Sequence, residues 1–125
     1  MSNAAYGIVV VSHVKELAEG IVRLLKEAAK DVPITYAGGT EEGSVGTSFD
    51  KINTAITEND AEEIFAFYDL GSAKMNLEMA IEVTDKKIHL FDTAVVESAY
   101  TAAALIQAAA PFDAIVAQLE PLKIK

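Results

Sequence analysis

The fold of this chain is decided by the stretch Gly7-Ile8-Val9-Val10-Val11-Ser12-His13. A short unbroken run of β-branched residues predicts a strand that is buried on both faces of a sheet. From Val14 onward apolar residues recur at helical spacing, so a helix is expected to follow directly. His13 falls at this junction, which in α/β proteins lies at the ligand-binding edge of the sheet. An imidazole that can become cationic is unusual where a helix dipole favours anions, but a histidine that carries a phosphoryl group would gain from that position.

Three more strand patterns follow, and a helical pattern comes after each of them. The strands are expected at residues 34–37, 64–68 and 87–91, and the helices after them at about 49–56, 72–83 and 95–110. Pro111 suits the first turn of a last helix that ends near Leu119, and residues 122–125 are predicted to form a short extra strand. The alternation predicts an α/β fold, a doubly wound, mostly parallel four-stranded sheet with strand order 2-1-3-4 and helices on both faces.

Apolar spacing also predicts which helix faces are buried. Met75 and Met79 are four residues apart and are expected to fill the core or an interface. The apolar face of the first helix is expected to contain Leu17, Ile21, Leu24, Leu25 and Ala28.

The length and composition predict a single globular domain. The 125 residues include no cysteine, which excludes disulfides and thiolate chemistry and fits a reducing compartment. We expect neither a membrane span nor a secretion signal. The net charge of −9 argues against nucleic acid as a partner; it would attract a basic protein or simply keep the chain soluble. Residues 1–5 are expected to be a start segment, in which Ser2-Asn3-Ala4 is typical of a cloning remnant, and residues 6–125 to form one domain.

The predicted strand order brings three segments to one edge of the sheet. His13 follows the first strand and Asp69 the third, so both would face one crevice, and the glycine-rich residues 38–48 would form its other wall. A carboxylate bonded to Nδ1 would fix the imidazole tautomer, leave Nε2 free as a nucleophile and stabilise the ring when it becomes positive. The simpler interpretation is that His13 begins one helix and Asp69 caps another.

Other kinds of site are less well supported by the sequence. The glycine-rich segment and Ser72 could donate hydrogen bonds to phosphoryl oxygens, although the segment has the spacing of neither a P-loop nor a dinucleotide fingerprint. As a plain long turn it would have no such role. Two histidines and no cysteine predict no metal site, and His89, inside the fourth predicted strand, is expected to be a structural or surface residue.

Together these motifs resemble the IIA domain of the mannose family of the bacterial phosphotransferase system. The resemblance rests on residues 7–13 with Leu17-Ala18-Glu19-Gly20, on Gly38-Gly39 through Val45-Gly46-Thr47-Ser48, and on Asp69-Leu70-Gly71-Ser72-Ala73-Lys74-Met75-Asn76. The last motif is the most specific, and it is similar to the phosphotransferase (M) subunits of phosphoenolpyruvate-dependent dihydroxyacetone kinases. Val14 replaces a common serine, and residues 92–98 depart from the family pattern, which leaves the loop after the fourth strand unassigned.

The resemblance implies a cytoplasmic, homodimeric phosphocarrier without a bound cofactor. His13 would carry the phosphoryl group and Asp69 would orient the ring. The residues around the phosphoryl group would be Gly39, Thr47, Ser48 and Ser72. The donor would be the histidine phosphocarrier protein HPr, and the acceptor would be ADP held on the L subunit of the kinase. Two alternatives stay open: a sugar-transport IIA domain that donates to a IIB protein, and a non-enzymatic regulatory module controlled by its phosphorylation state.

Overall fold

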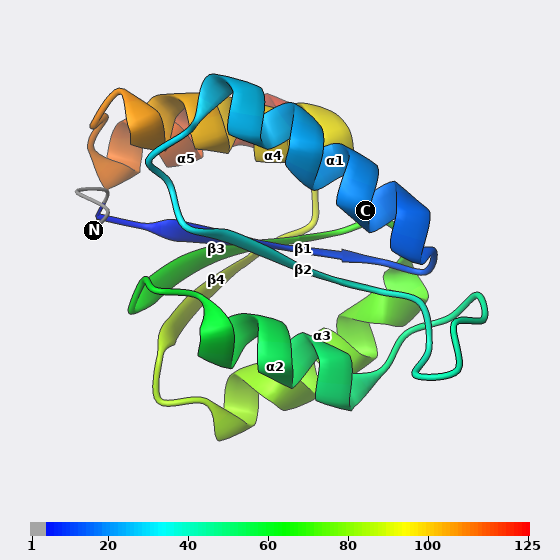
Figure 1. Cartoon of the computed structure of the whole chain (residues 1–125). Helices are drawn as coiled ribbons and strands as arrows, with labels where there is room; N and C mark the ends of the chain where they lie inside the picture. Colours follow the sequence, from blue (N-terminus) through cyan, green and yellow to red (C-terminus); the bar gives the residue numbers. More distant parts are fainter. Residues whose placement is uncertain (1–4) are drawn as a thin grey trace.

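The computed structural model describes residues 5–125, so the expected cloning remnant at residues 2–4 lies outside the described part. Its centre is a four-stranded sheet with the order β2-β1-β3-β4, in which every neighbouring pair is parallel (Figure 1). The strands are β1 (Gly7–Ser12), β2 (Ile34–Gly38), β3 (Glu63–Tyr68) and β4 (Lys87–Phe91). The predicted fold class and strand order are therefore confirmed.

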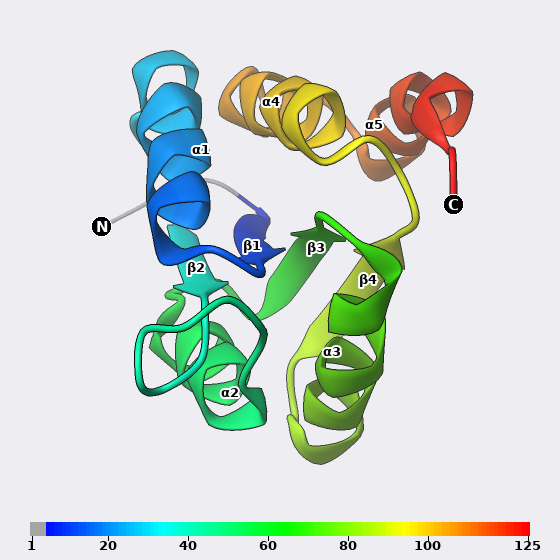
Figure 2. The same ribbon diagram turned by 90° about the vertical axis from the view of Figure 1, so that its right-hand side faces the viewer.

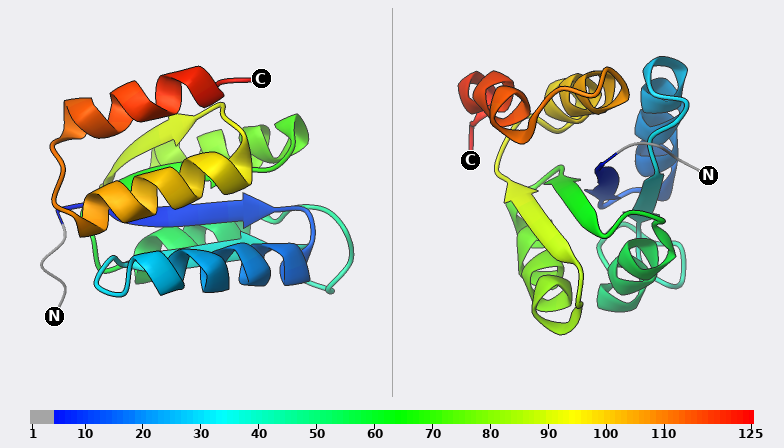
Figure 3. Two further views of the ribbon diagram at one scale, coloured as in Figure 1. Left: turned by 90° about the horizontal axis from the view of Figure 1, so that it is seen from above. Right: turned by 90° about the vertical axis from the view of Figure 1, so that its left-hand side faces the viewer.

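Helices cover both faces of the sheet. α1 (Lys15–Ala28), α4 (Val95–Gln107) and α5 (Phe112–Leu119) lie on one face, and α2 (Phe49–Glu58) and α3 (Gly71–Val83) lie on the other (Figures 1 and 3). A short 3₁₀ helix, η1 (Glu120–Leu122), follows α5. Because α1, α2 and α3 each connect two parallel strands, the chain returns to the same end of the sheet after every crossover.

Alternate residues of the central strands enter two different cores. Ile8 and Phe65 belong to the core toward α1, α4 and α5, whereas Val9 and Tyr68 belong to the core toward α2 and α3. All six residues of β1 are buried. Because the side chains on both faces of β1 and β3 are buried in these cores, we expect the polar side chains of a functional site to come from residues just beyond the ends of these strands.

The strand register aligns the carboxyl ends of β1, β2 and β3. Ser12 pairs with Gly38 in β2, and Val11 pairs with Tyr68 in β3. The residues that follow, His13, Gly39 and Asp69, therefore emerge at one end of the sheet, which faces the viewer in Figure 2. This is the edge at which open α/β sheets bind their ligands.

One predicted element is wrong, and one predicted helix ends earlier than expected. Residues 122–125 do not form a strand: Leu122 is the last residue of η1, which also contains Pro121, and the segment makes a single antiparallel bridge between Thr93 and Lys123. Proline has no amide hydrogen to give to a ladder, and the segment crosses the 92–94 loop instead of running beside β4. The fourth long helix also ends at Gln107, three residues early, with Ala109 in the left-handed conformation at φ 60°.

The predicted buried faces are only partly right. α1 buries Ala18, Ile21, Val22 and Leu25, but Leu17 and Leu24 stay half-exposed. α1 packs against α4 as well as against the sheet, so the set of residues that it buries differs from the one predicted for packing on the sheet alone. Met75 is 71% exposed and Met79 is exposed too, so these methionines do not fill the core.

Candidate functional site

The structure brings His13 and Asp69 together at the end of the sheet. The ring Nδ1 of His13 lies 2.9 Å from Oδ1 of Asp69, and the backbone amide of His13 donates to Oδ2 of the same carboxylate at 3.0 Å. The two side chains are only 15% and 10% exposed. One carboxylate thus fixes both the backbone and the ring of His13, which leaves the ring a single well-defined orientation.

Ser12 is a third member of this group, which the sequence reasoning missed. Its hydroxyl donates to Oδ2 of Asp69 at 2.9 Å and accepts the amide of Val14 at 3.1 Å. Ser12 is 1% exposed and is the only polar residue of β1. A hydroxyl at the end of an otherwise apolar strand, beside a candidate histidine, was the available signal.

Asp69 is held in its ionised form by four donors. Oδ2 accepts from the His13 amide and the Ser12 hydroxyl, and Oδ1 accepts from the His13 ring and from the Leu70 amide at 2.7 Å. Burial pushes the pKa of this carboxyl upward, but the hydrogen bonds together outweigh burial and hold the pKa below its ordinary value. Asp69 is therefore a carboxylate at neutral pH, and the hydrogen-bond network assigns the shared proton to Nδ1 of His13.

With Nδ1 protonated, Nε2 of His13 carries the lone pair of the ring. Ser72 lies in the first turn of α3, and its Oγ is 2.5 Å from Nε2. The N-terminus of α3 has no side-chain cap and no acidic residue in its first turn. Although His13 precedes α1, its Nε2 therefore faces the N-terminus of α3, where the helix dipole favours an anion.

The glycine-rich segment supports His13 through its backbone. The amide of Gly39 donates to the carbonyl of Ser12 at 3.2 Å, and the amide of Gly46 donates to the carbonyl of His13 at 2.9 Å. Gly39 has φ +73°, and a Cβ there would lie 3.0 Å from the carbonyl oxygen of Ser44. Glycine is needed at position 39 for this turn.

The remaining two predicted pocket residues differ in their placement. Ser48 is the N-cap of α2: its Oγ accepts the amide of Lys51 at 3.2 Å and donates to Glu41 at 3.2 Å. Thr47 accepts a hydrogen bond of 2.8 Å from Asn76 in α3, one turn after Ser72. Of the four predicted residues, only Ser72 has a described contact with the ring of His13, and Asn76, which the sequence reasoning did not assign to the site, holds Thr47.

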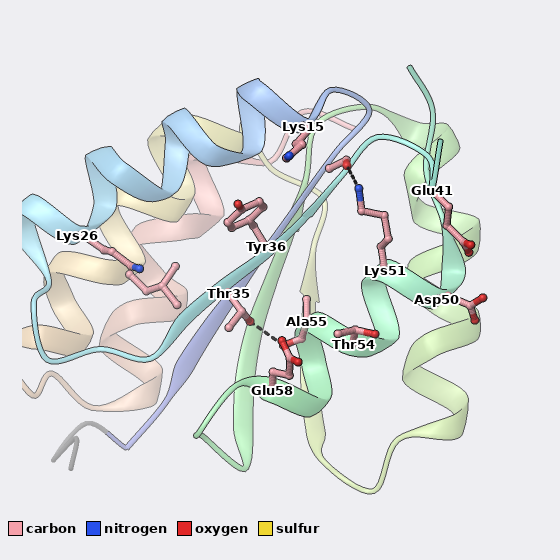
Figure 4. Close-up of a pocket in the computed structure, with 12 residues that line it drawn as sticks. Lys15, Lys26, Thr35, Tyr36, Glu41, Asp50, Lys51, Thr54, Ala55 and Glu58 are labelled. Atoms are coloured by element: carbon pink, nitrogen blue, oxygen red, sulfur yellow. Dashed lines mark hydrogen bonds between the residues drawn. The ribbon is translucent and has the colours of Figure 1, made fainter. Parts of the chain in front are cut away.

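A well-formed cavity lies elsewhere on the molecule. It has a volume of about 590 Å³ and lies between α1, β2 and α2, lined among others by Lys15, Tyr36 and Lys51 (Figure 4). The Lys51 ammonium donates to the carbonyl of Gly38 at 2.5 Å, as drawn in that view. His13, Asp69 and Ser72 do not line this cavity. The histidine site instead lies at the end of the sheet, where Ser72 is exposed.

The second histidine lies outside the site. Nε2 of His89 in β4 is 2.6 Å from Oε2 of Glu63, and its ring packs against Phe65 and Phe112. Within residues 5–125, no group of three or more histidine and carboxylate side chains is arranged to hold a metal ion. In the same range, no helix has the length and apolar character needed to cross a bilayer.

Comparison with known proteins gives consistent matches. The model of the EIIA-man family, described as the PTS system fructose IIA component, matches residues 7–116. A Lactococcus lactis protein, "PTS-dependent dihydroxyacetone kinase, phosphotransferase subunit DhaM", is 49% identical over 96% of this chain and 98% of its own length. A Listeria innocua protein, "PEP-dependent dihydroxyacetone kinase 1, phosphoryl donor subunit DhaM", is also 49% identical, over 96% and 97%.

Solved structures agree with these sequence matches. The crystal structure of the "unknown function protein EF1359" superimposes with a TM-score of 0.83 at 30% identity, covering 100% of this chain and 98% of that one. The phosphotransferase system component EIIA from Streptococcus agalactiae superimposes with a TM-score of 0.64 over 94% and 92%. At 21% identity, the second likeness supports the fold alone.

Proposed function

Because this chain belongs to the EIIA-man family of phosphotransferase system components, we propose that it is the phosphoryl donor subunit of a phosphoenolpyruvate-dependent dihydroxyacetone kinase. In this proposal Nε2 of His13 carries the phosphoryl group. One observation carries it: Asp69 holds Nδ1 at 2.9 Å while Nε2 faces the uncapped N-terminus of α3. The two DhaM relatives, each 49% identical, support the assignment to dihydroxyacetone kinase.

The chemistry follows from the protonation of the ring. The Nε2 lone pair attacks the phosphorus of a donor phosphohistidine, so that a P–N bond forms to His13 while the P–N bond of the donor breaks. The donor imidazole leaves with the electron pair of its broken bond. The His13 ring, which keeps its Nδ1 proton, becomes positive, and the carboxylate of Asp69 stabilises that charge at 2.9 Å.

Ser72 has to change its hydrogen bond during this step. Its hydroxyl lies at Nε2 before transfer, so it must turn away from the nitrogen and can then donate to an oxygen of the bound phosphoryl group. The first backbone amides of α3 add donors on the same side, in the way that helix N-termini bind phosphate. These groups would stabilise the transferring anion.

The proposal includes the partners that the family resemblance implies. The donor is the histidine phosphocarrier protein HPr, and the acceptor is ADP bound to the L subunit of the kinase. The chain works as a cytoplasmic homodimer. A sugar-transport role, with transfer to a IIB protein, is the competing assignment.

Two labelling experiments test the proposal. The protein is incubated with phosphoenolpyruvate, enzyme I and HPr, and the alkali-stable phosphohistidine is located by mass spectrometry. His13→Ala should abolish labelling, whereas His89→Ala, which removes the second histidine, should leave it intact. Equal labelling of the His13→Ala variant, or an unlabelled wild type, overturns the carrier role. Transfer from the labelled protein to an ADP-loaded L subunit, compared with transfer to a IIB protein, decides between the two acceptors.

A further inference from the structure

Residues 120–125 lie against the candidate site, although they follow the part of the chain that the family model matches, residues 7–116. Backbone hydrogen bonds attach them to the loop after β4. The amides of Ile124 and Lys125 donate to the carbonyl of Asp92 at 3.1 and 3.3 Å, and the amide of Ala94 donates to the carbonyl of Leu122 at 2.9 Å. These bonds place the side chain of Lys125 over the end of β3.

The ammonium of Lys125 binds the backbone of the residues that lead into the site. It donates to the carbonyl of Tyr68 at 2.7 Å and to the carbonyl of Asp69 at 2.8 Å, and it lies 4.4 Å from the centroid of the Tyr68 ring. The β3–β4 pairing ends earlier, at Phe67 and Phe91, so β4 offers no ladder partner to these two carbonyls. Lys125 supplies the donors that the strand ladder lacks at this position.

Asp92 also contacts both Tyr68 and the 120–125 segment. Its carboxylate accepts the Tyr68 hydroxyl at 2.5 Å and pairs with the Lys74 ammonium of α3 at 3.0 Å. Asp92 thus holds the 120–125 segment by its backbone and the ring of Tyr68 by its side chain. This gives a role to the loop after β4, where the sequence departs from the family pattern.

We propose that Lys125 is a positioning residue for phosphoryl transfer: it fixes the Asp69 peptide, so that the carboxylate stays aimed at Nδ1 of His13. The inference rests on the proposed carrier function. Each oxygen of Asp69 serves two donors, so a small rotation of its peptide would weaken several of these bonds together. A weaker bond at Nδ1 would let the proton move to Nε2, where it blocks the nucleophile.

Three variants of the full chain test this role. Lys125→Met removes the charge and the donors, Lys125→Arg keeps both, and Lys123→Met is the matched control because it removes a neighbouring cation without a described side-chain hydrogen bond. We measure the rate of His13 phosphorylation from HPr, the tautomer of the neutral His13 ring by ¹⁵N NMR, and the unfolding temperature. The NMR readout needs no partner protein.

We expect Lys125→Met to slow phosphorylation about tenfold, less than the roughly 100-fold that a 1 Å misplacement can cost. Its neutral ring should shift toward the Nε2-protonated tautomer. Lys125→Arg should restore the rate and the tautomer, and Lys123→Met should match the wild type in both. A Lys125→Met protein with an unchanged tautomer overturns the proposal, even if it unfolds at a lower temperature, and so does an arginine variant that is as slow as the methionine variant. If the wild type accepts no phosphoryl group, the carrier function fails, while the tautomer comparison still decides whether Lys125 positions Asp69.

Discussion

Asp69→Asn is the most informative single change, because an amide has the shape of the carboxylate but only one acceptor oxygen. In the wild type, the two oxygens accept from four donors. If the amide nitrogen takes the Oδ2 position, Ser12 can rotate to accept, but the backbone amide of His13 loses its acceptor. If the nitrogen takes the Oδ1 position, the Leu70 amide loses its acceptor and the ring must accept at Nδ1. The proton then lies on Nε2, and the ring cannot attack.

The size of the effect can be worked out from these bonds. If the part-buried amide of His13 is left unpaired, the free energy of unfolding should fall by about 1–3 kcal/mol; the Leu70 amide is exposed, so water can replace its lost acceptor at a smaller cost. The positive ring formed during transfer also loses a charge-assisted hydrogen bond, worth about 1.5–3 kcal/mol, which corresponds to a factor of roughly 10 to 150 in rate. The lost hydrogen bond and the fraction of molecules whose ring is protonated on Nε2 act together. We therefore expect phosphorylation of His13 to slow by at least about 10²-fold.

The assay compares single-turnover phosphorylation by phospho-HPr in the wild type, Asp69→Asn and the control Asp113→Asn, whose carboxyl lies on α5 away from the site. Urea unfolding gives the stability difference. Because the folded-state pKa of Asp69 is below its ordinary value of 3.8, its stabilising effect is present above that pH and is lost as the pH falls through the folded pKa. The difference in the free energy of unfolding between the wild type and Asp69→Asn should therefore become smaller at acid pH. An Asp69→Asn protein that is phosphorylated within about threefold of the wild-type rate would refute the orienting role.

Three further outcomes are expected. Ser12→Ala removes one donor to Asp69 and the acceptor of the Val14 amide, so it should slow phosphorylation of His13 by about tenfold in the same assay and lower the free energy of unfolding by about 1–3 kcal/mol. In the folded protein, burial and the bond to Asp92 raise the pKa of Tyr68 above 10.0, so the stabilising effect of its proton is present below about pH 10 and declines above it. Urea unfolding of Tyr68→Phe should show a smaller loss of stability between about pH 9 and about pH 11 than the wild type shows. Asn59→Ala removes a buried side chain that donates to two backbone carbonyls and accepts one amide, and should lower the free energy of unfolding by about 2–4 kcal/mol, as measured in urea, without altering transfer by the folded protein.

Part of the candidate site could be predicted because its signals are local. His13 ends an apolar run and Asp69 ends another, and the strand order alone makes them neighbours. Ser12 and Lys125 were missed because their roles depend on hydrogen bonds to Asp69, 57 and 56 residues away. Of the two roles predicted for Met75, the core role is wrong and the interface role stays a prediction, since helical spacing predicts a stripe of residues but not the direction that it faces.

The sequence by itself determined the α/β fold, the strand order and the edge at which His13 emerges, because burial on both faces of a strand leaves a local pattern of apolar residues. Only the tertiary structure decided the chemistry of the ring. Asp69 meets Nδ1 and Ser72 meets Nε2, and the α3 N-terminus lies beside the free nitrogen. Which nitrogen is held and which is free depends on where groups distant in sequence lie in space, and hydrogen-bond geometry of that kind is set only when the sheet and its helices have packed.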